Sequence, residues 1–158
     1  MIKILFICHG NICRSPMAEF VLKKMVRERG IEDEFEISSA ATSTEELGNP
    51  VYPPARREMA RHGIDCAGKY ARQVKKSDYE HYDFLICADR HNLRNLSYII
   101  GEDSENKVSL LLDYTGTTGA SISDPWYTGD FTATWNDIQR GCEGLLNKIL
   151  TARNSENI

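Results

Sequence analysis

The segment from Cys8 to Ser15 contains the residue types that a site for attack on phosphorus needs. Five residues separate Cys8 from Arg14, and Ser15 and Pro16 follow directly. A cysteine thiolate is a strong nucleophile, and both a nearby arginine and a helix N-terminus favour the thiolate over the thiol. The planar guanidinium of Arg14 matches two phosphoryl oxygens, and Ser15 can donate a hydrogen bond to the sulfur. The pattern therefore predicts that Cys8 attacks a phosphoryl group that Arg14 holds.

The backbone of this segment is expected to bind the phosphoryl group as well. The segment follows an apolar strand pattern over 2–7 and leads into a helical pattern at Pro16, with Ser15 as the expected N-cap. Successive N–H groups at such a junction can curl around an anion. The curl needs a positive φ, which we expect at Gly10 and, as a second position, at Asn11. The expected phosphate-binding residues of the loop are His9, Gly10, Asn11, Ile12, Cys13 and Ser15.

A general acid is predicted in a second loop. The leaving oxygen of a tyrosine-like ester has a pKa of about 10, so its departure benefits from a proton donor. Asp124 lies in a long loop rich in Gly, Ser and Thr, which is expected to open at the same sheet edge as Cys8. Pro125 restricts the backbone of Asp124, and Trp126 and Tyr127 supply apolar walls for an aryl substrate.

Strand patterns alternate with helix patterns along the chain. Strands are predicted over 2–7, 35–40, 84–87 and 108–112, and helices from 16, over 55–62, over 90–100 and from 131, with a frayed end over 151–158. Such alternation predicts an α/β fold, namely a doubly wound, four-stranded parallel sheet with helices on both faces. Ligands bind at the carboxyl ends of the strands in such sheets, which is where the Cys8 loop begins.

The composition indicates one globular domain over residues 1–158. Hydrophobic residues make up 41% of the chain, and the net charge of −4 argues against binding to nucleic acid or to an anionic membrane surface. The five cysteines are irregularly spaced, which predicts free thiols and a cytoplasmic location rather than a disulfide framework or a structural metal site. No cofactor, metal or membrane span is expected, and a monomer is expected.

These motifs together resemble those of the low-molecular-weight protein tyrosine phosphatases. The resemblance runs along almost the whole chain, with its most specific motifs at 8–19 and 124–127 and supporting matches at 38–40 and 71–73. It implies a two-step hydrolysis of phosphotyrosine in proteins, without metal, through a phosphocysteine at Cys8. Arg14 then stabilises the transferred phosphoryl group, and Asp124 serves first as general acid and then as base.

The resemblance also implies supporting roles for other residues. Asn11 and Ser15 hold the loop shape and the thiolate, and Ser39 forms a hydrogen bond with Asn11. Cys13 is the candidate partner of Cys8 in a reversible disulfide that protects the nucleophile, although a buried packing role is an equal alternative. The segment 44–46 is expected to form an acidic rim of the pocket and to disfavour acidic peptides.

Three other functions use similar residues. A thioredoxin-coupled arsenate reductase needs two further cysteines after the third strand, whereas Cys87 stands alone there. A protein-arginine phosphatase carries threonine at the position of Ile12, and the bulk of Ile12 suits an aryl ester better. A phosphate-binding module without catalysis needs neither the nucleophile Cys8 nor the acid Asp124.

Overall fold

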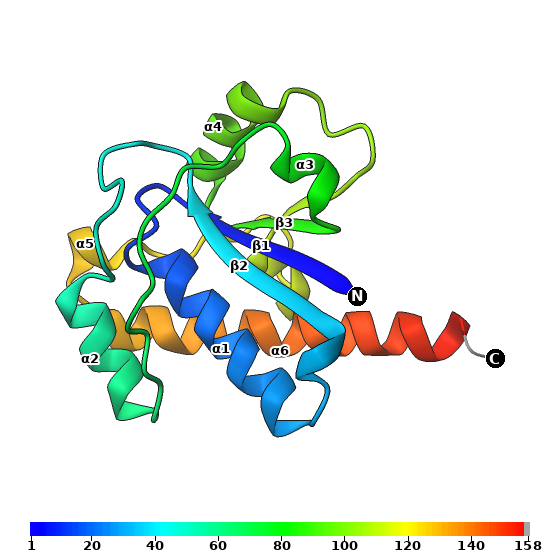
Figure 1. The fold of residues 1–158 in the computed structure, drawn as a ribbon, viewed down its shortest axis with the longest axis horizontal. Helices are drawn as coiled ribbons and strands as arrows, with labels where there is room; N and C mark the ends of the chain where they lie inside the picture. Colours follow the sequence, from blue (N-terminus) through cyan, green and yellow to red (C-terminus); the bar gives the residue numbers. More distant parts are fainter. Residues whose placement is uncertain (157–158) are drawn as a thin grey trace.

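The computed structural model describes residues 1–156. In chain order its elements are β1 Ile2–Cys8, α1 Arg14–Glu28, η1 Glu32–Glu34, β2 Phe35–Ala41, α2 Pro53–Arg61, α3 Asp78–His81, β3 Phe84–Cys87, α4 Arg90–Ile100, β4 Val108–Leu110, η2 Leu111–Thr115, α5 Pro125–Thr128 and α6 Phe131–Glu156. The labels η1 and η2 denote short 3-10 helices. Figure 1 shows how these elements surround the sheet.

The strands form a four-stranded sheet in the order β2-β1-β3-β4, and every pair is parallel. At the carboxyl end of β1, Cys8 pairs with Ala41 and Ile7 pairs with Cys87. The chain crosses from one side of β1 to the other between β2 and β3. The strand order therefore reverses at β1 and β3, whose carboxyl ends form the crevice in which such sheets bind ligands.

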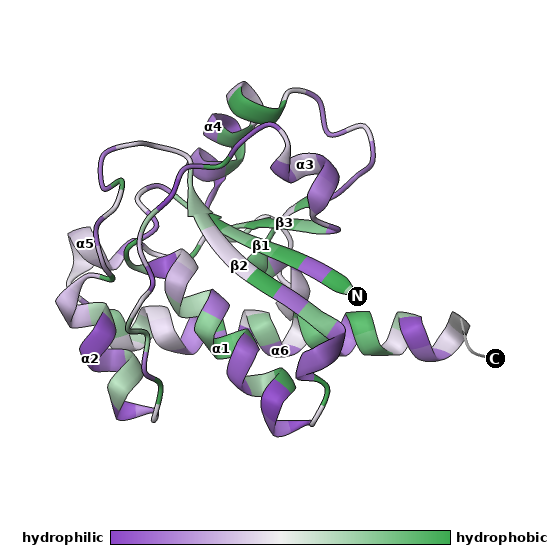
Figure 2. Ribbon diagram, viewed as in Figure 1, coloured by the Kyte–Doolittle hydropathy of each residue, from purple (hydrophilic) through white to green (hydrophobic). Residues whose placement is uncertain are grey.

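Both faces of the sheet are covered by helices. Ile4 and Phe6 pack with α1, α2 and α6, whereas Leu5 and Ile7 pack with α3 and α4 on the opposite face. Figure 1 shows these two groups of helices on either side of the strands, and Figure 2 shows the strands as largely hydrophobic. Burial on both faces explains the continuous apolar pattern of β1, because neither set of alternating side chains faces water. The predicted α/β class, parallel sheet and two-sided helical cover are confirmed.

Several predicted element boundaries differ from those of the structure, including both ends of α2, and two of the differences have a clear physical reason. α1 begins at Arg14 with Cys13 as its N-cap, so Ser15 lies inside the first turn, where its hydroxyl turns to the Cys8 sulfur instead of capping the helix. β4 ends at Leu110, two residues earlier than predicted, because the chain tightens into η2 directly afterwards. Leu111 and Leu112 of η2 are buried and apolar, and so short a run has no periodicity that distinguishes a 3-10 turn from the end of a strand.

The C-terminal helix is longer than predicted. α6 extends to Glu156, so the frayed end predicted for 151–156 is wrong, while 157–158 lie outside the described residues. An ion pair between Arg153 and Glu34 connects the last turns of α6 to the segment before β2. α3 and α5 were not predicted, because a helix of four residues is too short to show a helical period.

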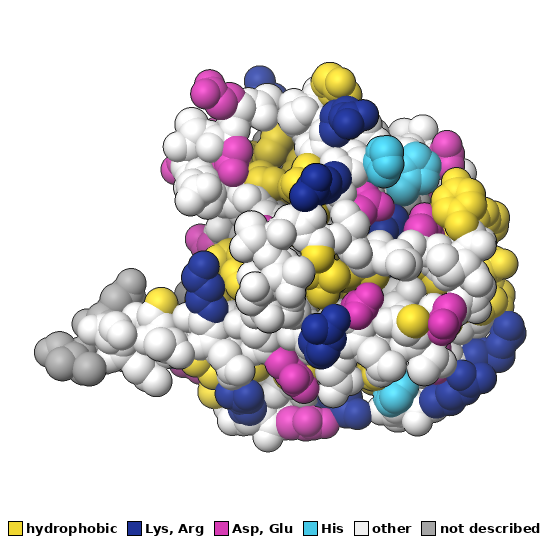
Figure 3. Space-filling view, turned by 180° about the vertical axis from the view of Figure 1, so that it is seen from behind, with side chains coloured by type: hydrophobic (Ala, Val, Ile, Leu, Met, Phe, Trp, Pro, Cys, Tyr) yellow, Lys and Arg dark blue, Asp and Glu magenta, His cyan; other side chains and the backbone are white. Residues whose placement is uncertain are grey.

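The surface carries charges of both signs. Figure 3 shows acidic, basic and hydrophobic side chains interspersed on the face opposite to that of Figure 1, with Lys and Arg gathered at the end where α2 lies. Within residues 1–156, no helix is both long enough and apolar enough to cross a membrane.

Two glycines of α6 allow that helix to approach η2 closely. A Cβ atom on Gly144 would lie 1.9 Å from the carbonyl oxygen of Tyr114, and one on Gly141 would lie 2.5 Å from Cγ of Leu111. Any larger residue at these positions would push the helix away from the turn that follows β4. The glycines therefore set the distance at which α6 covers this end of the sheet.

We expect Gly144→Ala to lower the free energy of unfolding by about 3 kcal/mol, because the clashing atom belongs to the backbone of Tyr114 and cannot rotate away. The better helix propensity of alanine, worth about 1 kcal/mol, does not offset this cost. Urea denaturation measures the change. The control is Asn147→Ala at an exposed position of α6, which should change stability by less than about 0.5 kcal/mol. Equal stability of Gly144→Ala and wild type would contradict the close packing.

Candidate active site

Cys8 is the last residue of β1, and its side chain sits at the bottom of the following loop. Only 3% of the residue is exposed. Its Sγ lies 3.3 Å from the backbone nitrogen of Asn11, 3.4 Å from that of Ser15 and 2.9 Å from Ser15 Oγ. Three groups that can donate hydrogen bonds therefore converge on the sulfur, which is the arrangement that stabilises a thiolate.

The loop owes its curl to Asn11 rather than to Gly10. Asn11 has a φ of 59°, whereas Gly10 does not adopt a positive φ. The positive φ predicted at Gly10 is therefore wrong, and the one predicted at Asn11 is confirmed. Asparagine tolerates this conformation better than most residues do. Gly10 instead allows close approach of the neighbouring loop, since a Cβ atom there would lie 3.3 Å from Cγ of Glu46.

The Asn11 side chain holds the loop from below. Its Nδ2 donates to Ser15 Oγ at 2.8 Å and to Ser39 Oγ at 2.9 Å, and its Oδ1 accepts from the Arg72 backbone N–H at 3.2 Å. The expected contact between Asn11 and Ser39 is thus present. Because Asn11 donates to Ser15 Oγ, the hydroxyl hydrogen of Ser15 is left to point at the Cys8 sulfur.

A buried carboxylate continues this network beneath the loop. Ser39 Oγ donates to Glu19 Oε1 at 2.6 Å, and Glu19 is 4% exposed. Lys23 and Lys69 lie 2.6 and 3.4 Å from the carboxylate oxygens of Glu19 and compensate its charge. The sequence analysis assigned no role to Glu19, which supports the loop from the second turn of α1.

The guanidinium of Arg14 is buried among acceptors from two separate segments, the residue after β3 and the loop before α5. Its Nη1 donates to Asp89 Oδ2 at 2.7 Å and to the Ile122 carbonyl oxygen at 2.8 Å, and its Nη2 lies 3.4 Å from Asp124 Oδ2. Burial acts to lower the pKa of Arg14, but the negative charges of Cys8 and Asp89 outweigh it and raise the pKa above its ordinary value. Arg14 therefore remains cationic beside the sulfur.

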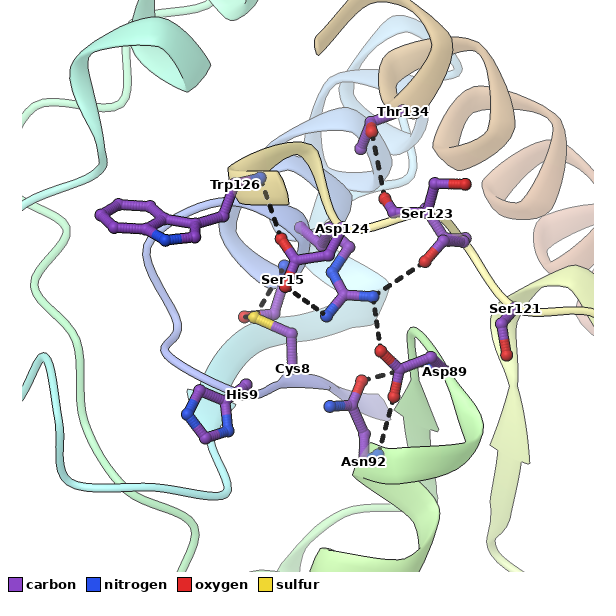
Figure 4. A network of polar contacts seen from close by, with 12 residues as sticks. Cys8, His9, Ser15, Asp89, Asn92, Ser121, Ser123, Asp124, Trp126 and Thr134 are labelled. Atoms are coloured by element: carbon purple, nitrogen blue, oxygen red, sulfur yellow. Dashed lines mark hydrogen bonds and ion pairs between the residues drawn. The ribbon is translucent and has the colours of Figure 1, made fainter. Parts of the chain in front are cut away.

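Asp89 is the residue of this site that the sequence analysis missed. It follows β3 and caps α4, with Oδ1 accepting from the Asn92 N–H at 2.8 Å, while Oδ2 binds Arg14. Figure 4 shows that Asp89 and Asp124 lie on two different segments of the chain. An aspartate at the carboxyl end of a strand, directly before a helical pattern, was the signal available in the sequence.

Asp124 occupies the N-cap of α5 and faces the Cys8 loop. Its Oδ1 accepts from the Trp126 N–H at 3.0 Å, while Oδ2 lies near Arg14. Figure 4 shows Asp124 between Trp126 and the Cys8–Ser15 pair. The loop after β4 therefore opens at the same sheet edge as the loop after β1, as the sequence analysis expected.

A cavity of about 380 Å³ opens above the sulfur. It is lined by Cys8, His9, Gly10, Ile12, Cys13, Arg14, Glu45, Glu46, Asp124, Trp126 and Tyr127. Asn11 and Ser15 do not line the cavity. Their side chains hold the loop and their backbone N–H groups face the Cys8 sulfur. Within residues 1–156, no cluster of three or more His, Cys, Asp or Glu side chains is placed to hold a metal ion.

Comparison with known proteins identifies the family. Residues 3–155 match the family described as low molecular weight phosphotyrosine protein phosphatase. The chain belongs to this phosphatase family. The family resemblance found in the sequence is therefore confirmed over nearly the whole chain, and with it the prediction of a phosphatase of the metal-independent, low-molecular-weight kind.

Relatives of this phosphatase family match the chain from end to end. The low molecular weight phosphotyrosine protein phosphatase of Gallus gallus is 40% identical over 150 residues, which cover 92% of this chain and 94% of that protein. The crystal structure of YfkJ from Bacillus subtilis is 35% identical and superposes with a TM-score of 0.92 over 96% of both chains. A crystal structure of drosophila arginine phosphatase, 28% identical, superposes with a TM-score of 0.85 over 94% of this chain and 98% of that chain. The family fold therefore does not by itself determine which phosphorylated amino acid is the substrate.

Cys13 lies in the phosphatase loop as a buried, protonated thiol. It is 6% exposed, and burial, followed by the negative charge of Cys8, raises the pKa of its thiol. Cys8 and Cys13 are both free in the structure. The reversible disulfide between them stays a prediction.

We expect Asn11→Ala to destabilise the phosphatase by about 3 kcal/mol, from about 1 kcal/mol of backbone strain at positive φ and the loss of buried hydrogen bonds. The matched control is Asn106→Ala, because Asn106 also has a positive φ, of 54°, but is exposed. The control should cost only the strain. Urea denaturation of both variants measures the difference, and equal losses would contradict a structural role for the Asn11 amide.

Proposed function

We propose that this phosphatase hydrolyses phosphotyrosine in proteins through a phosphocysteine intermediate on Cys8. The observation that supports it most directly is the Cys8 sulfur, which has Ser15 Oγ at 2.9 Å and lies in one cavity with Arg14 and Asp124. This cavity combines a nucleophile, a fixed cation for the phosphoryl oxygens and a carboxyl group for proton transfer. Binding alone would need neither the nucleophile nor the acid.

In the first step, the Cys8 thiolate attacks phosphorus, so that the S–P bond forms as the bond to the tyrosine oxygen breaks. Asp124 gives its proton to the leaving oxygen, whose conjugate phenol has a pKa of about 10. Arg14 and the loop N–H groups stabilise the charge on the transferred phosphoryl oxygens. Asp124 leaves this step as a carboxylate.

In the second step, water attacks the phosphocysteine. Asp124 takes a proton from this water, the O–P bond forms and the S–P bond breaks. The products are inorganic phosphate and the Cys8 thiolate, and Asp124 is protonated again for the next cycle. The phosphorylated side chain enters the cavity, and inorganic phosphate leaves it, on the side of Trp126 and Tyr127, which are 53% and 84% exposed.

The walls of the cavity favour an aryl ester over phosphoarginine. Within the Cys8 loop, Ile12 contributes a branched apolar side chain to the cavity lining, and Trp126 contributes an aromatic ring. The similarity to drosophila arginine phosphatase keeps a protein-arginine phosphatase as the second candidate function. Cys87 is a poor thiol relay for an arsenate reductase, because it is fully buried and burial raises the pKa of its thiol.

We further propose that the protein acts as a cytoplasmic monomer, as one domain, on tyrosine-phosphorylated proteins and without a nucleic-acid or membrane partner. All five cysteines are free, which is the usual state in a reducing compartment. The net charge of −4 gives no general attraction to nucleic acid.

We expect Cys8→Ser to abolish turnover of p-nitrophenyl phosphate, because a serine hydroxyl is a far weaker nucleophile in this site. Asp124→Ala should slow hydrolysis of phosphotyrosine by roughly 10²–10⁴-fold, since the leaving oxygen then departs without a proton. The control is Glu102→Ala, an exposed carboxylate outside the cavity, which should leave the rates unchanged. Release of inorganic phosphate is the measurement. Full activity of Cys8→Ser would refute the proposed nucleophile, and faster turnover of phosphoarginine than of phosphotyrosine would favour the second candidate.

The rim of the cavity predicts a preference among phosphopeptides. Glu45 and Glu46 line the cavity, whereas Thr44 of the expected acidic segment does not. We expect a peptide with lysine beside phosphotyrosine to show a several-fold higher kcat/KM than one with glutamate there, because like charges repel across the rim. The preference should shrink in high salt and in Glu45→Gln with Glu46→Gln. Equal turnover of both peptides at low salt would refute the prediction.

A further inference from the structure

Tyr52 lies where the start of α2 meets the Cys8 loop and the segment that carries Trp126. It is next to the cavity but is not part of its lining. It is the N-cap residue of α2, and its backbone N–H donates to the Ile12 carbonyl oxygen at 2.9 Å. The position of Tyr52 is therefore tied to the Cys8 loop. The cavity lining does not include Tyr52, so the side chain is not in contact with a bound phosphoryl group.

The ring of Tyr52 packs against the segment that carries the candidate acid. Its centroid lies 4.8 Å from that of Trp126, with the planes tilted by 48°, and 6.1 Å from that of Phe131. These distances are in the range of favourable aromatic pairs. Within residues 1–156, the Tyr52 hydroxyl makes no hydrogen bond, so the contact depends on the ring alone.

Trp126 in turn connects to the carboxylate of Asp124. The backbone N–H of Trp126 donates to Asp124 Oδ1 at 3.0 Å, and the opposite oxygen lies 3.4 Å from Arg14 Nη2. α5, which begins directly after Asp124, has only four residues, and a helix this short has no stability of its own. Its position must therefore come from contacts with neighbours, and the aromatic contact with Tyr52 is one of them.

We infer that Tyr52 is a positioning residue for proton transfer: its ring holds Trp126, and Trp126 holds Asp124 over the Cys8 sulfur. The inference rests on the proposed function. It states that Tyr52 acts on the step in which the leaving oxygen is protonated, and not on phosphate binding or on the nucleophile. The ring also packs with Ile12 and Cys13 of the Cys8 loop, but the groups that contact the Cys8 sulfur belong to Asn11 and Ser15. Loss of the ring therefore leaves these contacts in place but lets Asp124 sample positions from which it cannot donate.

The experiment compares kcat/KM for two aryl phosphates, since this ratio reports the first chemical step. Phenyl phosphate releases a phenol with a pKa of about 10 that needs the proton. 2,4-Dinitrophenyl phosphate releases a far more acidic phenol, which departs without one. We expect Tyr52→Ala to lower kcat/KM about tenfold for phenyl phosphate and less than about twofold for 2,4-dinitrophenyl phosphate. Tyr52→Phe, which keeps the ring, should retain both values.

Two controls keep the test decisive. Tyr98→Ala removes a tyrosine that is 79% exposed on α4 and should change neither substrate. Tyr52→Leu keeps apolar bulk if the alanine variant does not fold, and it should show the same selective loss. An equal loss on both substrates, or no loss on either, would overturn the inference. If wild type shows no turnover of 2,4-dinitrophenyl phosphate that Cys8→Ser abolishes, the proposed function itself fails first.

Discussion

The buried guanidinium of Arg14 is the interaction on which the site depends. A cation that is 3% exposed needs compensating partners, and Arg14 finds them in the Cys8 loop, in Asp89 after β3 and in Asp124 before α5. These groups follow three different strands of the sheet, β1, β3 and β4. The charge therefore connects the loops at the carboxyl edge and holds the two aspartates around the guanidinium.

Beneath the loop, a second hydrogen-bond network fixes the loop shape. Asn11 connects Ser15 to Ser39, and Ser39 passes the network on to the Glu19 carboxylate between two lysines. Because the polar side chains of this network are partnered with one another, the loop keeps its N–H groups directed at the sulfur. On the other side of the cavity, the short α5 has an aromatic contact with Tyr52.

Most of the strands and long helices follow from local patterns. The apolar run before Cys8, the stripe along α6 and the breakers between them predicted a parallel α/β sheet, because two-sided burial and helical period leave marks along the chain. The short elements α3, α5 and η2 left no such mark. The positive φ lies at Asn11, the second predicted position, and not at Gly10. The amide of Asn11 has the expected partner Ser39 and also the Arg72 backbone N–H, which the sequence did not reveal.

The sequence by itself determined which groups come together in the Cys8 loop, because Cys8, the loop N–H groups and Arg14 lie within one strand-to-helix turn. It also pointed to Asp124, through the composition of its loop. Only the tertiary structure decided the partners of these groups. Asp89 lies 75 residues from Arg14 along the chain, and the ring of Tyr52 packs against that of Trp126, which is also distant in sequence. Such contacts depend on how the helices dock and on which loops meet at the sheet edge, and no local period encodes either.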